Sequence, residues 1–410
     1  RERREGQAAL LSMNLLYIHQ YFCPPGGAGN NRSLEIASEW VKAGHQVTML
    51  TSTAYFPERL RFSEPVKTFE FAGIRVIALN VPYGHMMGFK DRIRSFLKFY
   101  RRAWKTAKGF EAPDLVYASS TPPTVGELGR KLAKRWNIPL VFETVDVWPD
   151  VPEGMGILKN KVALNWIHRR TNKIYEAAKL IVALSDGMAA QVRSHIDTPE
   201  KVVVRYNGTN PDAFPFVARS AAEVCEVIYT GTVGQANGID ALLLLCKDVE
   251  AAGRADIRFT ILGGGNDLAR AKVYAQSLGL TQLKFIATVP KEEVAGLMHN
   301  AEIGIVTFAP FPVLEANSAN KFYDYLASGL PVLLNYEGWQ ATYLKDGNAG
   351  LSTKMGDRAA LFQNLIKLVD SPTLREAMGK NGRALALKHF DRREIAKTLL
   401  QDFETVLNQQ

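Results

Sequence analysis

The chain has 410 residues, of which 22% are charged and 47% are apolar, and its formal net charge is +9. This length suits two or three domains, since a single hydrophobic core rarely grows past ~250 residues. Three widely spaced cysteines (Cys23, Cys225 and Cys246) exclude a disulfide framework, and no Cys/His spacing resembles a zinc site. No apolar run approaches the ~18 residues that a membrane span needs. Because Glu2 and Glu5 interrupt the basic N-terminus, it makes a poor signal peptide, and we expect a cytoplasmic protein.

Short β-branched runs alternate with longer helical patterns through the first half of the chain. A helix is expected over residues 33–43, where Gly44 ends it. This alternation predicts right-handed βαβ units and a mostly parallel sheet with helices on both faces. The expected strands are residues 14–21, 46–51, 74–79, 115–119, 140–143, 181–184 and 202–205.

The alternation stops at residues 207–222, where Asn-Gly and Asn-Pro pairs indicate a linker, and then it resumes. We therefore predict an α/β fold of two doubly wound domains, residues 13–208 and 223–391, joined by a linker at 209–222. Ligands of such sheets bind beyond the carboxyl ends of the strands, so the two domains should face each other across a cleft. The second domain's expected elements are strands 227–230, 259–262, 283–286, 303–307 and 331–335 and a helix at 239–252, and an amphipathic run at 392–407 follows.

Most of the positive charge lies in one segment, because residues 89–108 carry +7 of the chain's +9. Helical spacing puts basic residues on one stripe, with an apolar stripe beside it. Such a helix suits an anionic membrane surface, at about 1 kcal/mol per basic side chain. A solvated surface helix is the common alternative, and a nucleic-acid site, which lacks aromatic interleaving here, is another. The basic stripe is Arg94, Lys98, Arg101, Lys105 and Lys108, and the apolar stripe is Ile93, Leu97, Tyr100 and Trp104.

The segment 317–329 predicts a helix with a phosphate-binding start. Asn317 or Ser318 is a natural N-cap, and Gly329 supplies the stop. Free N–H groups of the first turn, at Ser318, Ala319 and Asn320, attract a phosphate together with the positive end of the helix dipole.

Two charged side chains strengthen this prediction. Lys321 lies in the first turn, where a positive side chain disfavours a helix unless an anion binds there. Asp324 is one turn further on the same face, where it can accept hydrogen bonds from sugar or ribose hydroxyls. The alternative is an ordinary capped helix with a Lys–Asp pair worth ~0.3 kcal/mol.

Glycine-rich turns follow three of the expected strands and would let a ligand approach the backbone closely. None matches the dinucleotide-binding or P-loop signature, which disfavours a nicotinamide cofactor and a Walker-type ATPase. Loops after strands also use glycine for geometry alone, so each turn by itself is a weak signal. The candidate ligand-binding residues there are Gly27, Gly29, Thr232, Gly234, Asn237, Gly263 and Gly264.

Six stretches of the chain carry a joint signal: residues 17–22, 146–149, 184–188, 206–208, 229–234 and 317–329. Taken together, they resemble the retaining GT-B nucleotide-sugar glycosyltransferases of glycosyltransferase family 4, and most closely the branch that builds bacterial surface polysaccharides. The resemblance implies two Rossmann-like domains, an active site between them and a C-terminal helix, 392–410, that crosses back to the first domain. It also implies that no metal or other cofactor is needed.

The resemblance implies transfer of a sugar, with retention, from a nucleotide sugar to a lipid-linked or oligosaccharide acceptor. We expect a UDP-sugar donor and a location on the inner face of the cytoplasmic membrane, without a nucleic-acid partner. Lys321 and the nearby amides would stabilise the leaving diphosphate. Asp146 resembles the position that contacts the donor sugar, although a turn carboxylate before Trp148-Pro149 is the plain alternative.

The sequence also departs from the family pattern. Ala316 stands where the family has the first glutamate of a pair, and Asp324 replaces the second. Thr232 and Asn237 stand where an arginine and a lysine clamp the diphosphate, so we expect Lys321 to take over that role. These departures leave open an inactive binding protein on the same fold, or a nucleic-acid binder that uses residues 90–108.

Overall fold

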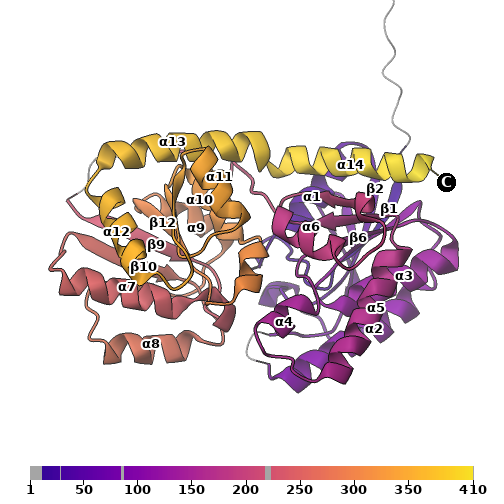
Figure 1. Cartoon of the computed structure of the whole chain (residues 1–410). Helices are drawn as coiled ribbons and strands as arrows, with labels where there is room; N and C mark the ends of the chain where they lie inside the picture. The colour runs from indigo at the N-terminus through magenta and orange to yellow at the C-terminus, as the bar shows by residue number, and fades with distance from the viewer. Residues whose placement is uncertain (1–11, 28, 85–86, 218–222, 410) are drawn as a thin grey trace, which may run out of the picture.

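The computed structural model describes residues 12–409, apart from residues 28, 85–86 and 218–222. The chain forms two α/β domains that lie side by side (Figure 1), each built on its own sheet. The predicted class, two doubly wound α/β domains, is confirmed. Residues 218–222 of the expected linker and residue 410 of the expected C-terminal helix lie outside the described residues.

The first domain contains an eight-stranded sheet in the order β3-β4-β2-β1-β5-β6-β7-β8. All neighbouring strands are parallel except β3 and β4. The seven predicted strands are present, with ends that shift by a few residues at most. The bounds are β1 Asn14–Ile18, β2 Gln46–Ser52, β3 Val66–Phe71, β4 Ile74–Leu79, β5 Leu115–Ser119, β6 Leu140–Thr144, β7 Leu180–Ala183 and β8 Val202–Val204.

Sequence patterning missed β3, which pairs antiparallel with β4 at the edge of this sheet. Its residues are exposed or only half-buried, so the strand does not show the buried run that marks the others. A short turn through Ala72 and Gly73, both with positive φ, joins the two strands. An edge strand of this kind depends on its partner rather than on its own apolar residues.

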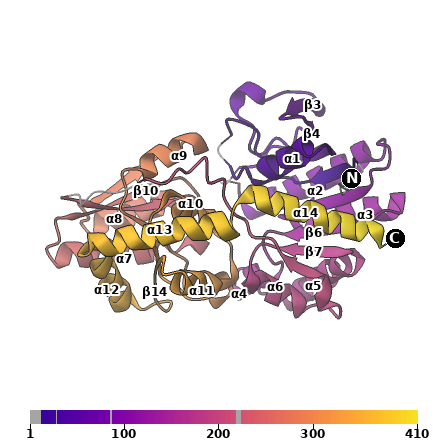
Figure 2. The same ribbon diagram turned by 90° about the horizontal axis from the view of Figure 1, so that it is seen from above.

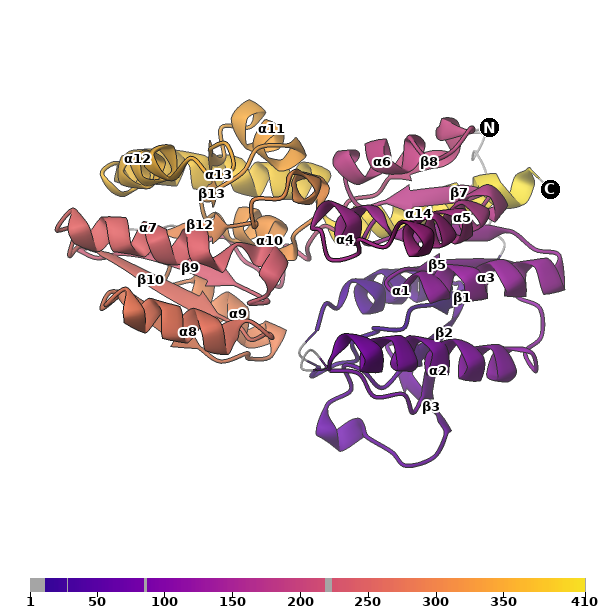
Figure 3. The same ribbon diagram turned by 60° about the horizontal axis from the view of Figure 1, so that its bottom comes forward.

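Helices cover both faces of this sheet, and two clusters of buried apolar side chains fill the spaces between. Figure 3 shows α2, α3 and α5 together on one side of the sheet. The predicted stop at Gly44 is observed, with positive φ at that residue. The helices are α1 Arg32–Lys42, α2 Phe89–Ala107, α3 Pro123–Trp136, α4 Asp150–Gly154, α5 Lys161–Ala177 and α6 Asp186–Arg193, with 3₁₀ turns η1 Glu58–Leu60 and η2 Pro199–Lys201.

The second domain contains a six-stranded parallel sheet in the order β11-β10-β9-β12-β13-β14. Every strand predicted here is present, and β14, which has only three residues, was missed. The strands are β9 Cys225–Thr230, β10 Ile257–Leu262, β11 Leu283–Ile286, β12 Ile303–Val306, β13 Val332–Leu334 and β14 Gly350–Ser352. The helices are α7 Ile239–Ala251, α8 Leu268–Ser277, α9 Lys291–Met298, α10 Asn320–Ser328, α11 Trp339–Asp346, α12 Arg358–Val369 and α13 Pro372–His389, with 3₁₀ turns η3 Gln235–Asn237 and η4 Pro312–Ala316.

The strand order fixes where a ligand can bind in each sheet. The direction in which successive strands are added to the sheet reverses between β1 and β5 in the first sheet, and between β9 and β12 in the second. At such a switch point the following loops diverge to opposite faces and leave a crevice at the carboxyl ends of the strands. The loop that starts at Gly231 and the segment before α10 follow β9 and β12, so topology alone brings them together.

The last helix, α14 (Arg392–Asn408), belongs to the first domain although it follows the second. In Figure 2, α13 lies over the second domain, and α14 continues its line over the first domain. It packs against α1, where Trp40 Nε1 donates a hydrogen bond to the carbonyl of Ala396 at 3.0 Å. The rings of Trp40 and Phe403 also meet, with centroids 5.1 Å apart. Apolar burial between α14 and α1 therefore ties the chain end to the first domain.

Two buried arginines hold the connection between the domains. The Arg32 guanidinium pairs with Glu143 at 2.7 Å and donates to the carbonyls of Tyr206 and Asn207, both at 2.8 Å. Arg392 pairs with Glu35 and donates to the carbonyl of Gly208 at 2.6 Å. The two crossings of the chain between domains are thus fixed by charge-assisted hydrogen bonds to backbone carbonyls.

No helix in the described part of the chain combines the length and the apolar character that crossing a membrane requires.

Candidate active site

Lys321, in the first turn of α10, is the most unusual charged residue at the domain boundary. It is only 8% exposed, and burial lowers the pKa of its ammonium to about 8, although Asp324 acts in the opposite direction. Its Nζ lies 4.6 Å from the centre of the Tyr229 ring. Among the described residues, Nζ takes part in no hydrogen bond and no ion pair within 4.0 Å. A buried ammonium without a hydrogen-bonded carboxylate is costly, and an anionic ligand would offset that cost.

The aliphatic end of Lys321 lies directly against Gly231, the first residue after β9. A Cβ on Gly231 would come within 3.4 Å of Lys321 Cε, and its φ of +117° also favours glycine. The N-terminus of α10 and the loop after β9 are therefore in contact. The sequence separates these residues widely, and the parallel sheet brings them together.

The segment before α10 carries unused backbone donors. The predicted N-cap at Asn317 or Ser318 is wrong, because the helix begins at Asn320 with Ala319 as its N-cap. Ser318 Oγ bonds the Tyr323 hydroxyl at 2.6 Å instead of capping the helix. In the described part of the chain, the amides of Ser318, Ala319 and Asn320 donate to no backbone carbonyl. These N–H groups remain available to a phosphate beside Lys321.

Asp324 has protein partners, which the sequence did not indicate. Its Oδ1 accepts a hydrogen bond from Thr209 Oγ1 in the interdomain connection at 2.7 Å. Its Oδ2 lies 4.0 Å from Nζ of Lys291. Asp324 therefore ties α10 to the connection between the domains, and only Oδ2 remains for a ligand.

Sequence reasoning missed Lys291, which begins α9 and points to the domain boundary. Its Nζ donates to Oδ1 of Asn31 in the first domain at 3.1 Å. It therefore supplies a second positive charge next to Asp324, on the side towards the first domain. No local motif marks this lysine, because its partners lie near residues 31 and 324.

The glycine loops after β9 and β10 pack on one another. A Cβ on Gly263 would lie 1.9 Å from the carbonyl oxygen of Gly231, and one on Gly264 would lie 2.8 Å from Thr288 Oγ1. The amide of Val233 donates to the carbonyl of Gly264 at 2.8 Å. Close packing of two backbones thus already explains glycine at position 263.

Thr232 and Asn237 lie in the loop where the family has its basic clamp. Thr232 is exposed, and its carbonyl accepts a hydrogen bond from the Tyr229 hydroxyl at 2.7 Å. The carbonyl of Asn237 accepts from Thr307 Oγ1 at 2.7 Å, and a Cβ on buried Gly234 would lie 3.3 Å from Asn237 Oδ1. These contacts order the loop next to Lys321 without adding charge.

Asp146 follows β6 at the carboxyl edge of the first sheet. Its Oδ2 accepts a hydrogen bond from Thr121 Oγ1 at 2.9 Å, and burial raises the pKa of the carboxyl. Thr121 itself follows β5, so two neighbouring strand ends position this carboxylate. The side chain is half-buried, which leaves one face open to a ligand.

The glycine loop after β1 is also packed internally. A Cβ on Gly27 would lie 2.6 Å from Cys23 Sγ, and one on Gly29 would lie 2.9 Å from the Tyr55 ring. The next residue, Asn30, reaches across the boundary, where its Nδ2 donates to Asn320 Oδ1 at 3.5 Å. The loop therefore adjoins the start of α10, as the inter-domain site requires.

Ala316, which stands where the family has a glutamate, lies in contact with the first domain. Ala316 packs against Gly187 of α6, where an added Cβ would lie 2.7 Å from the Ala316 Cα. The Ser185 hydroxyl, which also caps α6, donates to the Ala316 carbonyl. Position 316 therefore carries no carboxylate, and its backbone lies directly against α6 of the first domain.

The basic segment forms α2, and its charged stripe faces solvent. Arg94, Lys98, Arg101, Lys105 and Lys108 are all exposed. The predicted apolar stripe is only partly buried, since Ile93 is 37% and Leu97 is 42% exposed. The buried face consists of Ser95, Phe99, Ala103 and Ala107 instead. A surface groove on α2 is lined by Arg94, Leu97, Lys98, Arg101 and Arg102.

Potential metal ligands lie elsewhere in the first domain. Among the described residues, one group of three (Asp150, His168 and His195) has the ligand types and spacing that a metal ion requires. None of the donor-site candidates belongs to it.

The comparisons with known proteins identify the families of the two domains. A model of the glycosyl transferase 4-like domain matches residues 27–208, and a model of glycosyl transferases group 1 matches residues 214–385. The chain is also 24% identical, over 94% of its length and 88% of the relative's, to the D-inositol 3-phosphate glycosyltransferase of Streptomyces scabiei.

Solved structures show the same fold over nearly the whole chain. Sucrose-phosphate synthase of Thermosynechococcus elongatus superimposes with a TM-score of 0.76 at 18% identity, covering 97% of this chain and 99% of that one. HepE of Anabaena, solved in complex with UDP-glucose, has a TM-score of 0.71 at 17% identity and covers 96% and 100%. Both domain families, the two-sheet fold and the arrangement of α10 at the boundary lead to one conclusion: the chain is a glycosyltransferase of the GT-B type, with a glycosyl transferase 4-like domain followed by a group 1 domain.

Proposed function

We propose that this enzyme transfers a sugar, with retention, from a UDP-sugar to a lipid-linked glycan acceptor during assembly of a surface polysaccharide. The observation that carries the proposal is the Lys321 ammonium, which is buried at the start of α10 without a hydrogen-bonded counter-ion. A nucleotide diphosphate supplies the missing negative charge. HepE, which shares this fold, was solved with UDP-glucose, and this supports uridine as the base.

The reaction separates a nucleoside diphosphate from an oxocarbenium-like sugar, so negative charge develops on the leaving β-phosphate. Lys321 and the amides of Ser318–Asn320 would stabilise this charge without reorganising. The side chain supplies one full charge and the backbone supplies directed N–H groups, so in this proposal the leaving group needs no metal. The leaving phosphate then takes the proton of the acceptor hydroxyl as that oxygen attacks C1 from the same face.

The other candidate residues have distinct roles in this proposal. Asp146 contacts hydroxyls of the donor sugar from the first domain, where Thr121 orients it. Asp324 uses Oδ2 for the donor and Oδ1 for Thr209, so donor binding is coupled to the connection between the domains. Closure of the two domains would then bring Asp146 over the sugar.

The acceptor side rests on α2. Its exposed basic stripe and the exposed side chains of Ile93 and Leu97 suit reversible docking on an anionic membrane, where a lipid-linked acceptor is confined. We therefore propose a peripheral location on the inner face of the cytoplasmic membrane.

The test is a panel of UDP- and GDP-sugars, screened by thermal stabilisation and then by turnover with membrane extracts as acceptor source. A donor at ~100 times its dissociation constant stabilises the fold by about 2.7 kcal/mol, which a melting curve resolves. Proton NMR of the product reports the anomeric configuration. Two results support the proposal: stabilisation by a UDP-sugar, and a product whose anomeric configuration is the same as that of the donor. Stabilisation without hydrolysis or transfer under any condition would instead indicate an inactive binding protein.

A further inference from the structure

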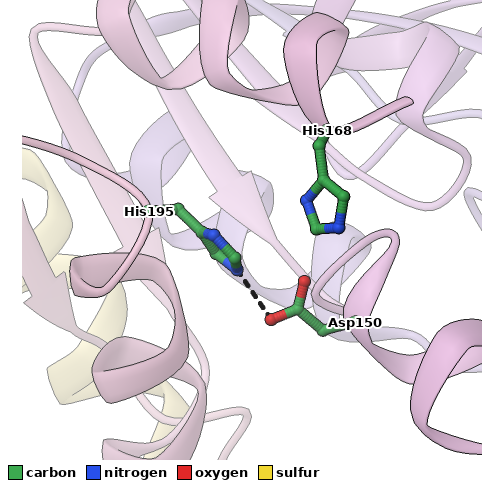
Figure 4. Close-up of side chains that lie close together, drawn as sticks. All are labelled: Asp150, His168 and His195. Atoms are coloured by element: carbon green, nitrogen blue, oxygen red, sulfur yellow. Dashed lines mark hydrogen bonds and ion pairs between the residues drawn. The ribbon is translucent and has the colours of Figure 1, made fainter. Parts of the chain in front are cut away.

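Three metal-ligating side chains converge in the first domain. Asp150 is the first residue of α4, His168 lies in α5, and His195 follows α6. Their ligand atoms all lie within 4.8 Å of one another, and within the described residues no other group of this kind occurs. Figure 4 shows the three side chains turned towards a common space.

Asp150 has a carboxylate oxygen that the protein leaves unsatisfied. Its Oδ2 lies 2.8 Å from Nε2 of His195. Its Oδ1 is buried and has no hydrogen-bond partner among the described residues. A buried oxygen without a partner costs roughly 1–3 kcal/mol, and a bound cation would remove this cost.

His168 is held in an orientation typical of a metal ligand. Its Nε2 lies 3.2 Å from Oε2 of Glu153, one turn along from Asp150, which leaves Nδ1 for another partner. Metal-bound histidines commonly donate their second ring N–H to a carboxylate, which fixes the tautomer and the plane of the ring. Glu153 is thus a positioning residue for His168.

We propose that Asp150, His168 and His195 bind a divalent transition-metal ion of the zinc class. Two imidazoles and one carboxylate suit Zn²⁺, whereas Mg²⁺ and Ca²⁺ prefer ligand sets made of oxygen. Side-chain exposures of 18% for Asp150, 24% for His195 and 28% for His168 leave an entry path and room for water as a fourth ligand.

The ion would join three segments that are already linked by the contact of Asp150 with His195 and of Glu153 with His168. It fixes α4 to α5 and to the turn after α6. Asp150, the ligand in α4, is four residues beyond Asp146 in the sequence. On its other side α4 meets the second domain, since a Cβ on Gly154 would lie 2.7 Å from Cγ1 of Val313 in η4. The metal therefore stabilises the part of the first domain that contacts the second. It does not replace Lys321, which lies in the other domain.

The test is titration of the chelator-treated full chain with Zn²⁺ by isothermal calorimetry. We expect one Zn²⁺ per chain and no comparable binding of Mg²⁺. His168→Asn and His195→Asn should each weaken Zn²⁺ binding by at least about 100-fold. His299→Asn, at an exposed histidine of the second domain, is the matched control and should bind like the wild type. Equal Zn²⁺ affinity in the wild type and both cluster variants, or less than one equivalent in the wild type, would overturn the proposal.

Two further measurements keep the result independent of folding and of activity. Co²⁺ should produce the intense visible absorption of a four-coordinate site in the wild type, and this absorption should be absent in His195→Asn with unchanged far-UV circular dichroism. Glu153→Gln should weaken binding by about 10–100-fold, as expected of a residue that positions a ligand. Unchanged affinity in Glu153→Gln, or a six-coordinate Co²⁺ spectrum, would contradict the assignment. Because metal binding is measured directly, the outcome does not depend on the proposed glycosyl transfer.

Discussion

Lys321 is surrounded by an aromatic ring, a glycine backbone and unused amides, so its charge can be tested separately from its packing. Lys321→Met keeps most of the side-chain volume and removes the ammonium. We expect turnover to fall by on the order of 10²–10³, because the leaving diphosphate loses its main side-chain counter-charge. Initial rates with the best donor of the panel measure this effect. Lys367→Met, at an exposed position of α12, is the control and should have normal rates. Near-normal turnover in Lys321→Met would mean that another positive side chain stabilises the leaving diphosphate, and Lys291 is the first candidate.

The buried ammonium should also make the ligand-free protein less stable than the variant. Burial lowers the pKa of Lys321 to about 8, whereas an unfolded lysine titrates near 10.5. Below pH 8 both states bind the proton and the full cost of the buried charge is present. Between pH 8 and 10.5 the unfolded state binds more protons, so this cost disappears as the pH rises.

Lys321→Met should therefore have a higher unfolding free energy than the wild type at pH 7, by on the order of 1–3 kcal/mol, and most of this difference should be lost at pH 10. Urea unfolding at both pH values measures it. Adding UDP should reverse the order at pH 7, because only the wild type gains the ion pair. A wild type that is more stable than the variant without ligand would show that Tyr229 already compensates the charge.

At the scale of the element, α2 can be changed without disturbing a core. Four of its exposed basic residues, Arg94, Lys98, Arg101 and Lys105, face away from the buried side of the helix. Changing all four to glutamate should release the protein from anionic vesicles, since each contributes about 1 kcal/mol near the surface. Donor hydrolysis in solution should be unchanged.

Vesicle flotation at low and high salt measures this release. The control carries the same charge change in the second domain, at Arg258, Lys284, Lys354 and Lys367, all of which are exposed. It should float like the wild type. If both variants lose binding equally, net charge rather than α2 is responsible. A wild type that does not float at low salt would leave α2 as a solvated face.

At the scale of the whole molecule, the ion pair between Arg32 and Glu143 lies at the connection of the two domains. Glu143 is 1% exposed, and Tyr117 and Ser119 also donate to it, at 2.7 and 2.6 Å. Burial by itself raises the pKa of Glu143. Arg32 and these hydroxyls lower the pKa by more than burial raises it, so the net shift is downward and the carboxylate stays charged. Removing its charge leaves the buried guanidinium without a counter-charge.

Glu143→Gln should therefore lower the unfolding free energy by about 3–5 kcal/mol. Glu376→Gln, which breaks the exposed pair with Lys380, should leave the unfolding free energy nearly unchanged, because solvent screens this pair. Urea denaturation of both variants makes the comparison. Equal losses in the two variants would mean that the hydroxyls and carbonyls around Arg32 suffice to hold the connection.

The sequence by itself determined the periodic parts of this protein. Buried parallel strands and their helices carry local signals, so expectations such as the strand at 283–286 or the stop at Gly329 required no knowledge of the fold. The departures at Ala316, Thr232 and Asn237 were also visible, because they stand inside recognisable stretches. The edge strand β3 was not visible, since its residues are largely exposed and its partner strand decides its conformation.

Only the tertiary structure decided which distant side chains meet. Lys321 lies against Gly231 and Tyr229, Asp324 bonds Thr209, and Lys291 reaches Asn31, because parallel strands bring their carboxyl ends to one edge whatever their distance along the chain. The group of Asp150, His168 and His195 is the clearest case, since α4, α5 and the turn after α6 each supply one ligand and no spacing rule connects them. Periodicity is a property of neighbouring residues, whereas a site depends on contacts that exist only after the sheets and helices have packed.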